Sequence, residues 1–248
     1  MKKTLVVAVF ALFAMVSGFA QELKMVNIPG KNFKMSKTEV TQEVYIKIMG
    51  SSPSYRDDKC PVSKVSFYDA LCFCNKLSVK EGLEPVYNVN VSHIEGDEYV
   101  YTDEKDVSKW GYEPHEGNKL YGKITVDEKA NGYRLPTVEE WLYAAQGGQN
   151  FKYAGSDDYT KVAVTVDAYS PEEVASLLPN GYGLYDMNGN VSEWCWDGQD
   201  GEYAFRTICG GNYNSGSDMS VTSEQGKIRP TEYMFEIGFR VVCASAKN

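Results

Sequence analysis

The chain of 248 residues has few basic residues and no long apolar run, and each shortage removes a class of function. Lysine and arginine number 25 against 34 aspartates and glutamates, which gives a formal net charge of −9 at pH 7. An acidic chain without a basic run is a poor electrostatic partner for nucleic acid. The longest apolar run, residues 5–16, has 12 residues, whereas a helix that spans a bilayer needs roughly 20. We therefore expect no nucleic-acid partner and no transmembrane segment in the mature chain.

Motifs of the common catalytic and metal centres are also missing. The two histidines, His93 and His115, do not have the spacing of a zinc site, and Cys72 and Cys74 are separated by one residue rather than two. The chain contains no GxSxG nucleophile elbow, no phosphate-binding loop and no HExxH helix. These absences argue against catalysis of the corresponding classes.

The first twenty residues have the pattern of an export signal. Two lysines follow the initiator methionine, the apolar run comes next, and Gly18 and Ala20 provide the small residues that a signal peptidase requires. The alternative is an uncleaved anchor. We interpret residues 1–20 as a signal peptide and residues 21–248 as one domain, and we expect the mature protein at the cell surface, outside the cell or in the periplasm.

Cysteine usage is compatible with export. The count after residue 20 is even, which permits three disulfides in an exported protein, and sequence cannot sort the pairings. A set of buried free thiols is the alternative, and the sequence leaves both open. The residues are Cys60, Cys72, Cys74, Cys195, Cys209 and Cys243.

Short segments of regular structure predict an α+β domain with much loop. Capping hydroxyls predict helices that begin after Thr41, Ser66 and Thr137, and the last two have an acidic residue three positions later, as in a capping box. Alternating apolar residues predict short strands near residues 25–35, 87–102 and 237–243. We expect residues 83–130 to be a surface excursion, because their apolar content is too small for a separate core.

Six segments, in order, carry a resemblance to a known family. The chain resembles the formylglycine-generating enzyme (sulfatase-modifying factor) domain family over about residues 22–243, and a chance match of six ordered pieces is very improbable. The resemblance implies a C-type-lectin-like fold of the α+β class, with short strands and two or three helices. The matching segments are residues 37–41, 61–70, 132–141, 180–194, 210–213 and 237–240.

One of these segments implies a structural calcium ion. In the family the motif around residues 188–190 holds calcium, an ion that prefers hard oxygen ligands. The alternative is that Glu193 pairs with a cation such as Arg134 or Arg240, two arginines that we interpret as structural. Carried over position by position, the calcium ligands are Asp186, Gly189, Val191 and Glu193, with carbonyl oxygens from Gly189 and Val191.

The redox chemistry of the family is missing from this chain. The resemblance places the two copper(I)-binding cysteines of the enzymes at Ser215 and Ser220. A hydroxyl is a hard, weakly acidic ligand, whereas copper(I) prefers thiolates. Cys209 lies before the two glycines of the motif and is in the wrong place. We therefore predict no copper site and no formylglycine-generating activity.

Residues 212–236 have a composition suited to binding. Tyrosine supplies rigid contact area and small polar residues supply adaptable hydrogen bonds, as in antibody loops; a plain polar loop is the alternative. The segment resembles the variable region of proteins diversified by diversity-generating retroelements, such as those of Treponema. The candidate ligand contacts are Tyr213, Asn214, Ser215, Ser217, Asp218, Ser220, Thr222, Tyr233 and Phe235.

The sequence thus favours a non-catalytic, exported binding protein, whose partner we expect to be a protein or another surface macromolecule. Two other functions stay open. One is an oxidoreductase of the formylglycine-generating type that uses atypical residues. The other is a structural subunit of an envelope complex, in which the same surface docks one fixed partner.

Overall fold

Each helix begins where the sequence places a capping hydroxyl. The computed structural model describes residues 23–54, 56–96 and 98–245, and its three α-helices have Thr41, Ser66 and Thr137 at their N-caps, each accepting a hydrogen bond from a backbone N–H three residues later. Ser66 and Thr137 form complete capping boxes. The predicted signal peptide, residues 1–20, lies outside the described residues. The helices are α1 (Gln42–Met49), α2 (Phe67–Lys80) and α3 (Val138–Gln146).

Within the described residues the strands form four small sheets, which confirms the predicted α+β fold with short strands. The predicted strand at 237–243 is divided between two sheets, one part parallel to β8 and the other antiparallel to β2. In sheet order, the strands are β1 (Met25–Asn27), β2 (Phe33–Ser36) and β12 (Val242–Ala244); β10 (Gln225–Ile228), β9 (Phe205–Cys209), β8 (Ser192–Gln199) and β11 (Ile237–Gly238); β4 (Glu98–Glu104), β3 (Tyr87–Glu95) and β5 (Lys123–Val126); and β6 (Ala163–Val164) and β7 (Asn188–Gly189).

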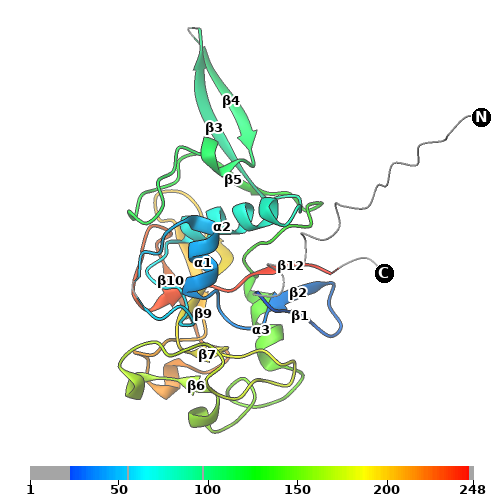
Figure 1. Ribbon diagram of the computed structural model, residues 1–248, viewed down its shortest axis with the longest axis vertical. Coiled ribbons are helices and arrows are strands. Elements are labelled where there is room, and N and C mark those ends of the chain that lie inside the picture. Colours follow the sequence, from blue (N-terminus) through cyan, green and yellow to red (C-terminus); the bar gives the residue numbers. More distant parts are fainter. Residues whose placement is uncertain (1–22, 55, 97, 246–248) are drawn as a thin grey trace, which may run out of the picture.

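Buried apolar side chains gather on both sides of the four-stranded sheet β10-β9-β8-β11, since the neighbouring β8 residues Trp194 and Cys195 belong to different groups. One group packs around α1 and α2, and the other packs around α3. Residues 83–130, expected to be a surface excursion, contribute Trp110, Tyr112 and Leu120 to the first group. The expectation holds for the outer half of the β3–β4 hairpin, which projects from one end of the molecule (Figure 1).

The C-terminal segment runs along one side of the molecule. Its short 3-10 helix η4 (Ser217–Met219) lies near β6 and β7, at the end opposite the hairpin (Figure 1). The chain then passes through β10 and returns beside α2 before it enters β11. No helix in the described ranges has the length and apolar character needed to cross a membrane.

Candidate functional site

An aromatic corner stands out on the surface of the C-terminal segment, and we define it as Lys64, Tyr233, Met234 and Phe235. The Lys64 ammonium nitrogen lies 5.9 Å from the ring centroid of Tyr233 and 5.1 Å from that of Phe235. The side chains of Tyr233, Met234 and Phe235 remain 40%, 44% and 50% exposed, respectively. Cation–π contacts of this kind fix the lysine between the rings while leaving their outer faces free.

The backbone on both sides of the corner is tied to the scaffold. Lys64 N–H donates to the Met234 carbonyl at 2.9 Å, and Phe67 N–H, at the start of α2, donates to the Pro230 carbonyl at 3.1 Å. On the other side, Ser192 N–H of β8 donates to the Glu236 carbonyl at 2.8 Å. These bonds use the backbone groups of the segment, so the side chains between them face solvent from a fixed position.

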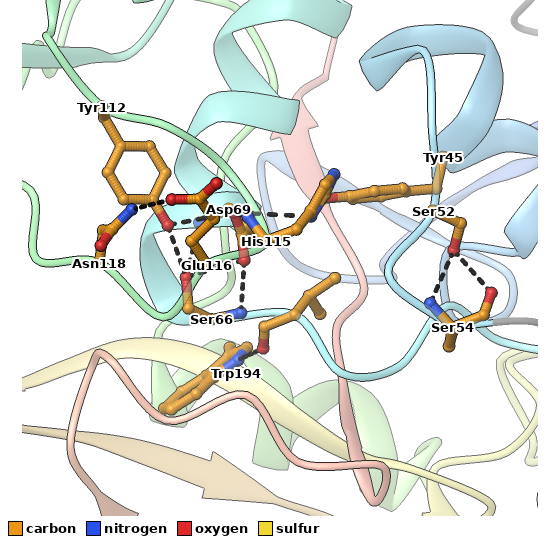
Figure 2. A network of polar contacts seen from close by, with 11 residues as sticks. Tyr45, Ser52, Ser54, Ser66, Asp69, Tyr112, His115, Glu116, Asn118 and Trp194 are labelled. Atoms are coloured by element: carbon orange, nitrogen blue, oxygen red, sulfur yellow. Dashed lines mark hydrogen bonds and ion pairs between the residues drawn. The ribbon is translucent and has the colours of Figure 1, made fainter.

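A buried polar network surrounds the start of α2 and joins it to residues 112–115 (Figure 2). The Asp69 carboxylate, which has no exposed surface, accepts hydrogen bonds from Ser66 N–H at 2.8 Å and Ser66 Oγ at 2.9 Å. It also accepts from the Tyr112 hydroxyl at 3.1 Å and from the backbone N–H of His115 at 3.0 Å. The cap of α2 therefore holds residues 112–115 in place.

The loop held by this network reaches the corner through Gly117. A Cβ atom built on Gly117 would lie 2.2 Å from the Tyr233 ring, and Gly117 has a left-handed backbone with φ of +65°. Glycine permits both this backbone and the close approach of the ring. Burial lowers the pKa of His115, two residues earlier, whose Nδ1 lies 3.8 Å from an Asp69 oxygen.

A shallow hollow lies beside the corner at the junction of β8, β9 and β10. Its volume is about 170 Å³, and Asn212 closes one side by donating from its side chain to Ser192 Oγ at 2.9 Å. The side chains around it are mostly small or polar. They come from Ser192, Ile208, Asn212, Ser215, Met219, Glu224 and Gln225.

The structure divides the nine candidate contact residues between surface and interior. Asn214, Asp218, Tyr233 and Phe235 are exposed, and Ser215 and Ser217 are half-buried. The other three are buried: Tyr213, Ser220 and Thr222. Lys64, Met219 and Met234 are exposed or half-exposed beside the candidates and were not in the predicted set.

The buried members are turned toward the turn at residues 188–190. Asn188 donates from its side chain to the Ser220 carbonyl at 2.7 Å, and Thr222 Oγ1 donates to Asn188 Oδ1 at 3.5 Å. Tyr213 N–H donates to the Asn190 carbonyl at 2.9 Å. In this arrangement Tyr213, Ser220 and Thr222 hold the segment on the scaffold and do not present contacts to a ligand.

Hydroxyl groups stand at the two positions, Ser215 and Ser220, where the resemblance implies copper-binding cysteines. Ser215 Oγ accepts a hydrogen bond from Asn212 N–H at 3.2 Å, and Ser220 Oγ is buried without a hydrogen-bond partner. The six cysteines all lie within the described residues and are buried free thiols. Of the two alternatives, disulfides and buried thiols, the structure therefore has buried thiols. Cys195 and Cys209 approach each other to 3.7 Å, and burial, followed by the contact with Cys209, raises the pKa of the Cys195 thiol.

The two carboxylates among the predicted calcium ligands have hydrogen-bond partners within the chain. Both Glu193 oxygens are used by Arg240, at 2.7 Å from Nε and 2.7 Å from Nη2, and one also accepts from Trp141 Nε1 at 2.7 Å. Asp186 accepts from Ala175 N–H at 2.7 Å. Among the described residues, no three acidic, histidine or cysteine side chains are grouped to hold a metal ion. The alternative pairing of Glu193 with Arg240 is therefore present, and the calcium set Asp186, Gly189, Val191 and Glu193 stays a prediction.

A further carboxyl group lies beside this ion pair. Glu39 has no exposed surface, and neither of its oxygens makes a hydrogen bond. Burial, reinforced by the charges of Asp186 and Glu193, raises the pKa of Glu39 well above its ordinary value. The raised pKa favours the neutral form of Glu39, and this form places fewer negative charges beside the buried guanidinium of Arg240.

Similar proteins cover most of the chain. It is 34% identical over 243 residues to "Chaperone protein LppX" of Paenibacillus barcinonensis, a match that covers 87% of this chain and 81% of that protein. It is 40% identical over 83 residues to a formylglycine-generating enzyme of Streptomyces coelicolor, but this match covers only 27% of this chain and 26% of the enzyme. The likeness to the enzyme is therefore local.

Solved structures and a family model agree on the fold. Treponema denticola variable protein 1 has a TM-score of 0.74 and 30% identity, and the match covers 89% of this chain and 91% of that one. A structure titled CarF has a TM-score of 0.66 and 30% identity, with 86% of each chain covered. The model of the sulfatase-modifying factor enzyme 1-like domain matches residues 12–245. With its three helices and its small sheets of short strands, the chain belongs to this sulfatase-modifying factor enzyme 1-like domain family.

Proposed function

We propose that this chain is an exported, non-catalytic binding protein that recognises a polypeptide through the aromatic corner and the exposed residues beside it. The observation that carries the proposal is the corner itself. Three consecutive large side chains stay half-exposed around Lys64 while the backbone beneath them is fixed on both sides. Tyrosine, phenylalanine and methionine are enriched in protein interfaces, and a pre-organised surface loses less entropy on binding.

The shape of the surface favours a macromolecular ligand. The hollow beside the corner has about 170 Å³, whereas pockets for small molecules have roughly 300–1,000 Å³. The exposed residues Asn214 and Asp218 extend the polar part of the surface beyond the hollow. A similar protein named a chaperone, and a similar structure named a variable protein, support a polypeptide ligand. On this proposal, residues 214, 218, 233 and 235 are the positions where variation between copies changes the ligand.

The chemistry of the face supports binding without catalysis. The copper positions carry hydroxyls at Ser215 and Ser220, and Ser220 is fully buried. The cysteines lie in the interior. Burial raises the pKa of five of them, which disfavours the thiolate that redox chemistry and copper(I) require: Cys60, Cys72, Cys74, Cys195 and Cys243. Conversion of a cysteine-containing sulfatase-motif peptide by the purified protein in the presence of copper would overturn this part of the proposal.

Photo-crosslinking tests the binding surface. A benzophenone amino acid replaces Phe235 in one protein and Val79 in a control; Val79 is exposed at the other end of α2. Each protein is irradiated with an envelope extract of the source cells. We expect a discrete adduct from position 235 only, removed by excess unmodified protein but not by the Tyr233→Ser/Phe235→Ser variant.

Two outcomes would contradict the proposal, and one would redirect it. Equal adducts from positions 235 and 79, or equal competition by the variant and the unmodified protein, would remove the corner as the binding surface. One adduct that occupies every copy of the chain would favour a structural subunit of an envelope complex. Export is tested separately, because cleavage after Ala20 predicts a mature protein that begins at Gln21.

A further inference from the structure

The outer half of the β3–β4 hairpin leaves strand edges unpaired. In the sheet order β4-β3-β5, β5 pairs with residues 87–90 of β3 and goes no further, while β4 stands at the edge over its seven residues. Among the described strands none covers this edge, and the hairpin extends away from the body of the molecule (Figure 1). An edge strand presents unpaired N–H and C=O groups that accept another strand.

One face of this hairpin is apolar and exposed, and we define the hairpin face as Ile94, Tyr99 and Tyr101. Ile94 pairs with Tyr99 across the two strands, and Ser92 pairs with Tyr101, so the three large side chains share one side. They are 66%, 71% and 65% exposed. Edge strands in proteins are usually protected by charged side chains, above all lysine, by proline or by a bulge. β4 has acidic residues but no lysine, proline or register shift, so its charges repel an acidic strand and attract a basic one. This strand is therefore suited to accept a partner.

The charges along β4 indicate which kind of strand can pair with its free edge. β4 contains Glu98, Asp103 and Glu104 and no basic residue. Antiparallel pairing of β4 with a second copy would bring together two strands that each keep the acidic charges of Glu98 and Asp103, since Lys109 pairs only with Glu104. Like charges directly opposite each other destabilise a sheet, whereas opposite charges stabilise it. The acidic edge thus disfavours a second copy and favours a basic strand.

We propose that β4 binds an extended segment of a protein partner, with alternating basic and apolar residues, by adding it to the sheet as a strand. Its apolar side chains lie on Tyr99 and Tyr101, and a lysine or arginine faces Glu98 on the opposite side, because Glu104 already pairs with Lys109 at 3.2 Å. Main-chain hydrogen bonds supply the affinity and the alternation supplies the specificity, as in other β-strand additions. This surface is separate from the aromatic corner, and the two are tested independently.

A synthetic peptide serves as the probe. It has the length of β4 and alternates lysine with valine, and its binding to the full chain is followed by fluorescence anisotropy. One control peptide replaces each lysine with glutamate. A second keeps every lysine and replaces two valines with proline, which removes main-chain donors but preserves the charge. We expect saturable binding of the first peptide only, weakened by added salt because the charges are exposed.

Protein variants locate the site. Tyr99→Ser/Tyr101→Ser, and separately Glu98→Lys, are expected to weaken binding roughly tenfold or more. Tyr169→Ser/Tyr203→Ser removes two other exposed tyrosines outside the hairpin and should leave binding unchanged. All of these side chains are on the surface, so unfolding curves that match the unmodified protein confirm that the variants fold.

Several results would overturn the proposal. These are no binding of the lysine–valine peptide, equal binding of the glutamate or proline peptide, or unchanged binding to the hairpin variants. A dimer seen by sedimentation and lost in Tyr99→Ser/Tyr101→Ser would also overturn it, because the occupant of the edge would then be a second copy. None of these outcomes affects crosslinking from position 235.

Discussion

The two halves of the C-terminal segment have similar residue types and opposite orientations. In the inner half of the segment, residues 212–224, Tyr213, Ser220 and Thr222 are buried beside the turn at residues 188–190. In the outer half, residues 229–236, Tyr233 and Phe235 stay exposed, and Lys64, Phe67 and Ser192 of the scaffold donate to backbone carbonyls of this half. The comparison shows that composition identifies a loop capable of binding, whereas the polar groups beneath the loop decide which of its residues are available.

The largest difference in the free energy of unfolding is expected between Tyr213→Ser in the inner half and Tyr233→Ser in the outer half. Tyr213 is 8% exposed and Tyr233 is 40% exposed. Removing a buried ring leaves a cavity, so Tyr213→Ser should lower the free energy of unfolding by about 3–5 kcal/mol, whereas an exposed position should change it by about 0.5 kcal/mol or less. Urea denaturation of both variants measures the difference. Equal losses would show that the two halves do not differ as described.

A smaller effect is expected from Gly117→Ala in the loop that supports Tyr233. The alanine would have to adopt a φ of +65° and would displace the Tyr233 ring, at a cost of about 1–3 kcal/mol. Unfolding measures this cost, and loss of crosslinking from position 235 reports the displaced ring. Gly216→Ala is the matched control in the inner half, because nothing lies within 4 Å of its Cβ position and its φ is −63°. An equal effect of the two substitutions would contradict the support role of Gly117.

The fold was predictable because its signals are local. Capping hydroxyls fixed the start of each helix, and left-handed glycines at positions 50 and 147 end two of them. The burial of Tyr112 was not predictable, because its hydroxyl donates to Asp69, which lies about forty residues earlier in the chain. The order of residues within a segment predicts the hydrogen bonds inside that segment, but it does not predict hydrogen bonds between segments that are distant in the sequence.

The candidate site was predictable only in part for the same reason. Tyr233 and Phe235 belong to the predicted segment, but Lys64 reaches them from a distant part of the chain, and no property of residues 61–70 marks it as a binding residue. Glu193 was predicted to face either calcium or an arginine. The choice depends on Arg240, which lies between β11 and β12 and donates to both carboxylate oxygens.

Acidification should affect the outer half before the inner half. Burial lowers the pKa of His115, an effect that Lys76 increases and that the neighbouring Asp69 opposes. Because the unfolded state has the ordinary histidine pKa of about 6.5, it gains a proton first as the pH falls, and stability decreases from about neutral pH down through the lowered pKa of the folded state. Tyr45, the remaining titratable group facing the ring, stays protonated in this range.

Hydrogen exchange measures this prediction by segment. Residues 112–118 and 230–236 should exchange faster as the pH falls, after correction for the intrinsic rate, while residues 212–224 should not. His115→Asn is the control variant, since asparagine tolerates the left-handed backbone of this position, with φ of +72°, and does not titrate. The variant should remove the pH dependence. A uniform response of both halves would mean that the network around Asp69 does not support the corner.

The smallest expected effect is that of calcium on the inner half. This half is anchored on Asn188 and Asn190, within the motif that implied a calcium site. Because Arg240 already neutralises Glu193, an added cation would meet the positive guanidinium in place of a free carboxylate. Calcium and a chelator should therefore give the same melting temperature. A ligand at about 100 times its Kd would add about 2.7 kcal/mol to the folded state, so even weak specific binding is measurable, and magnesium serves as the control for ionic strength. A rise with calcium alone would mean that the ion, rather than the arginine, holds the turn on which the inward half depends.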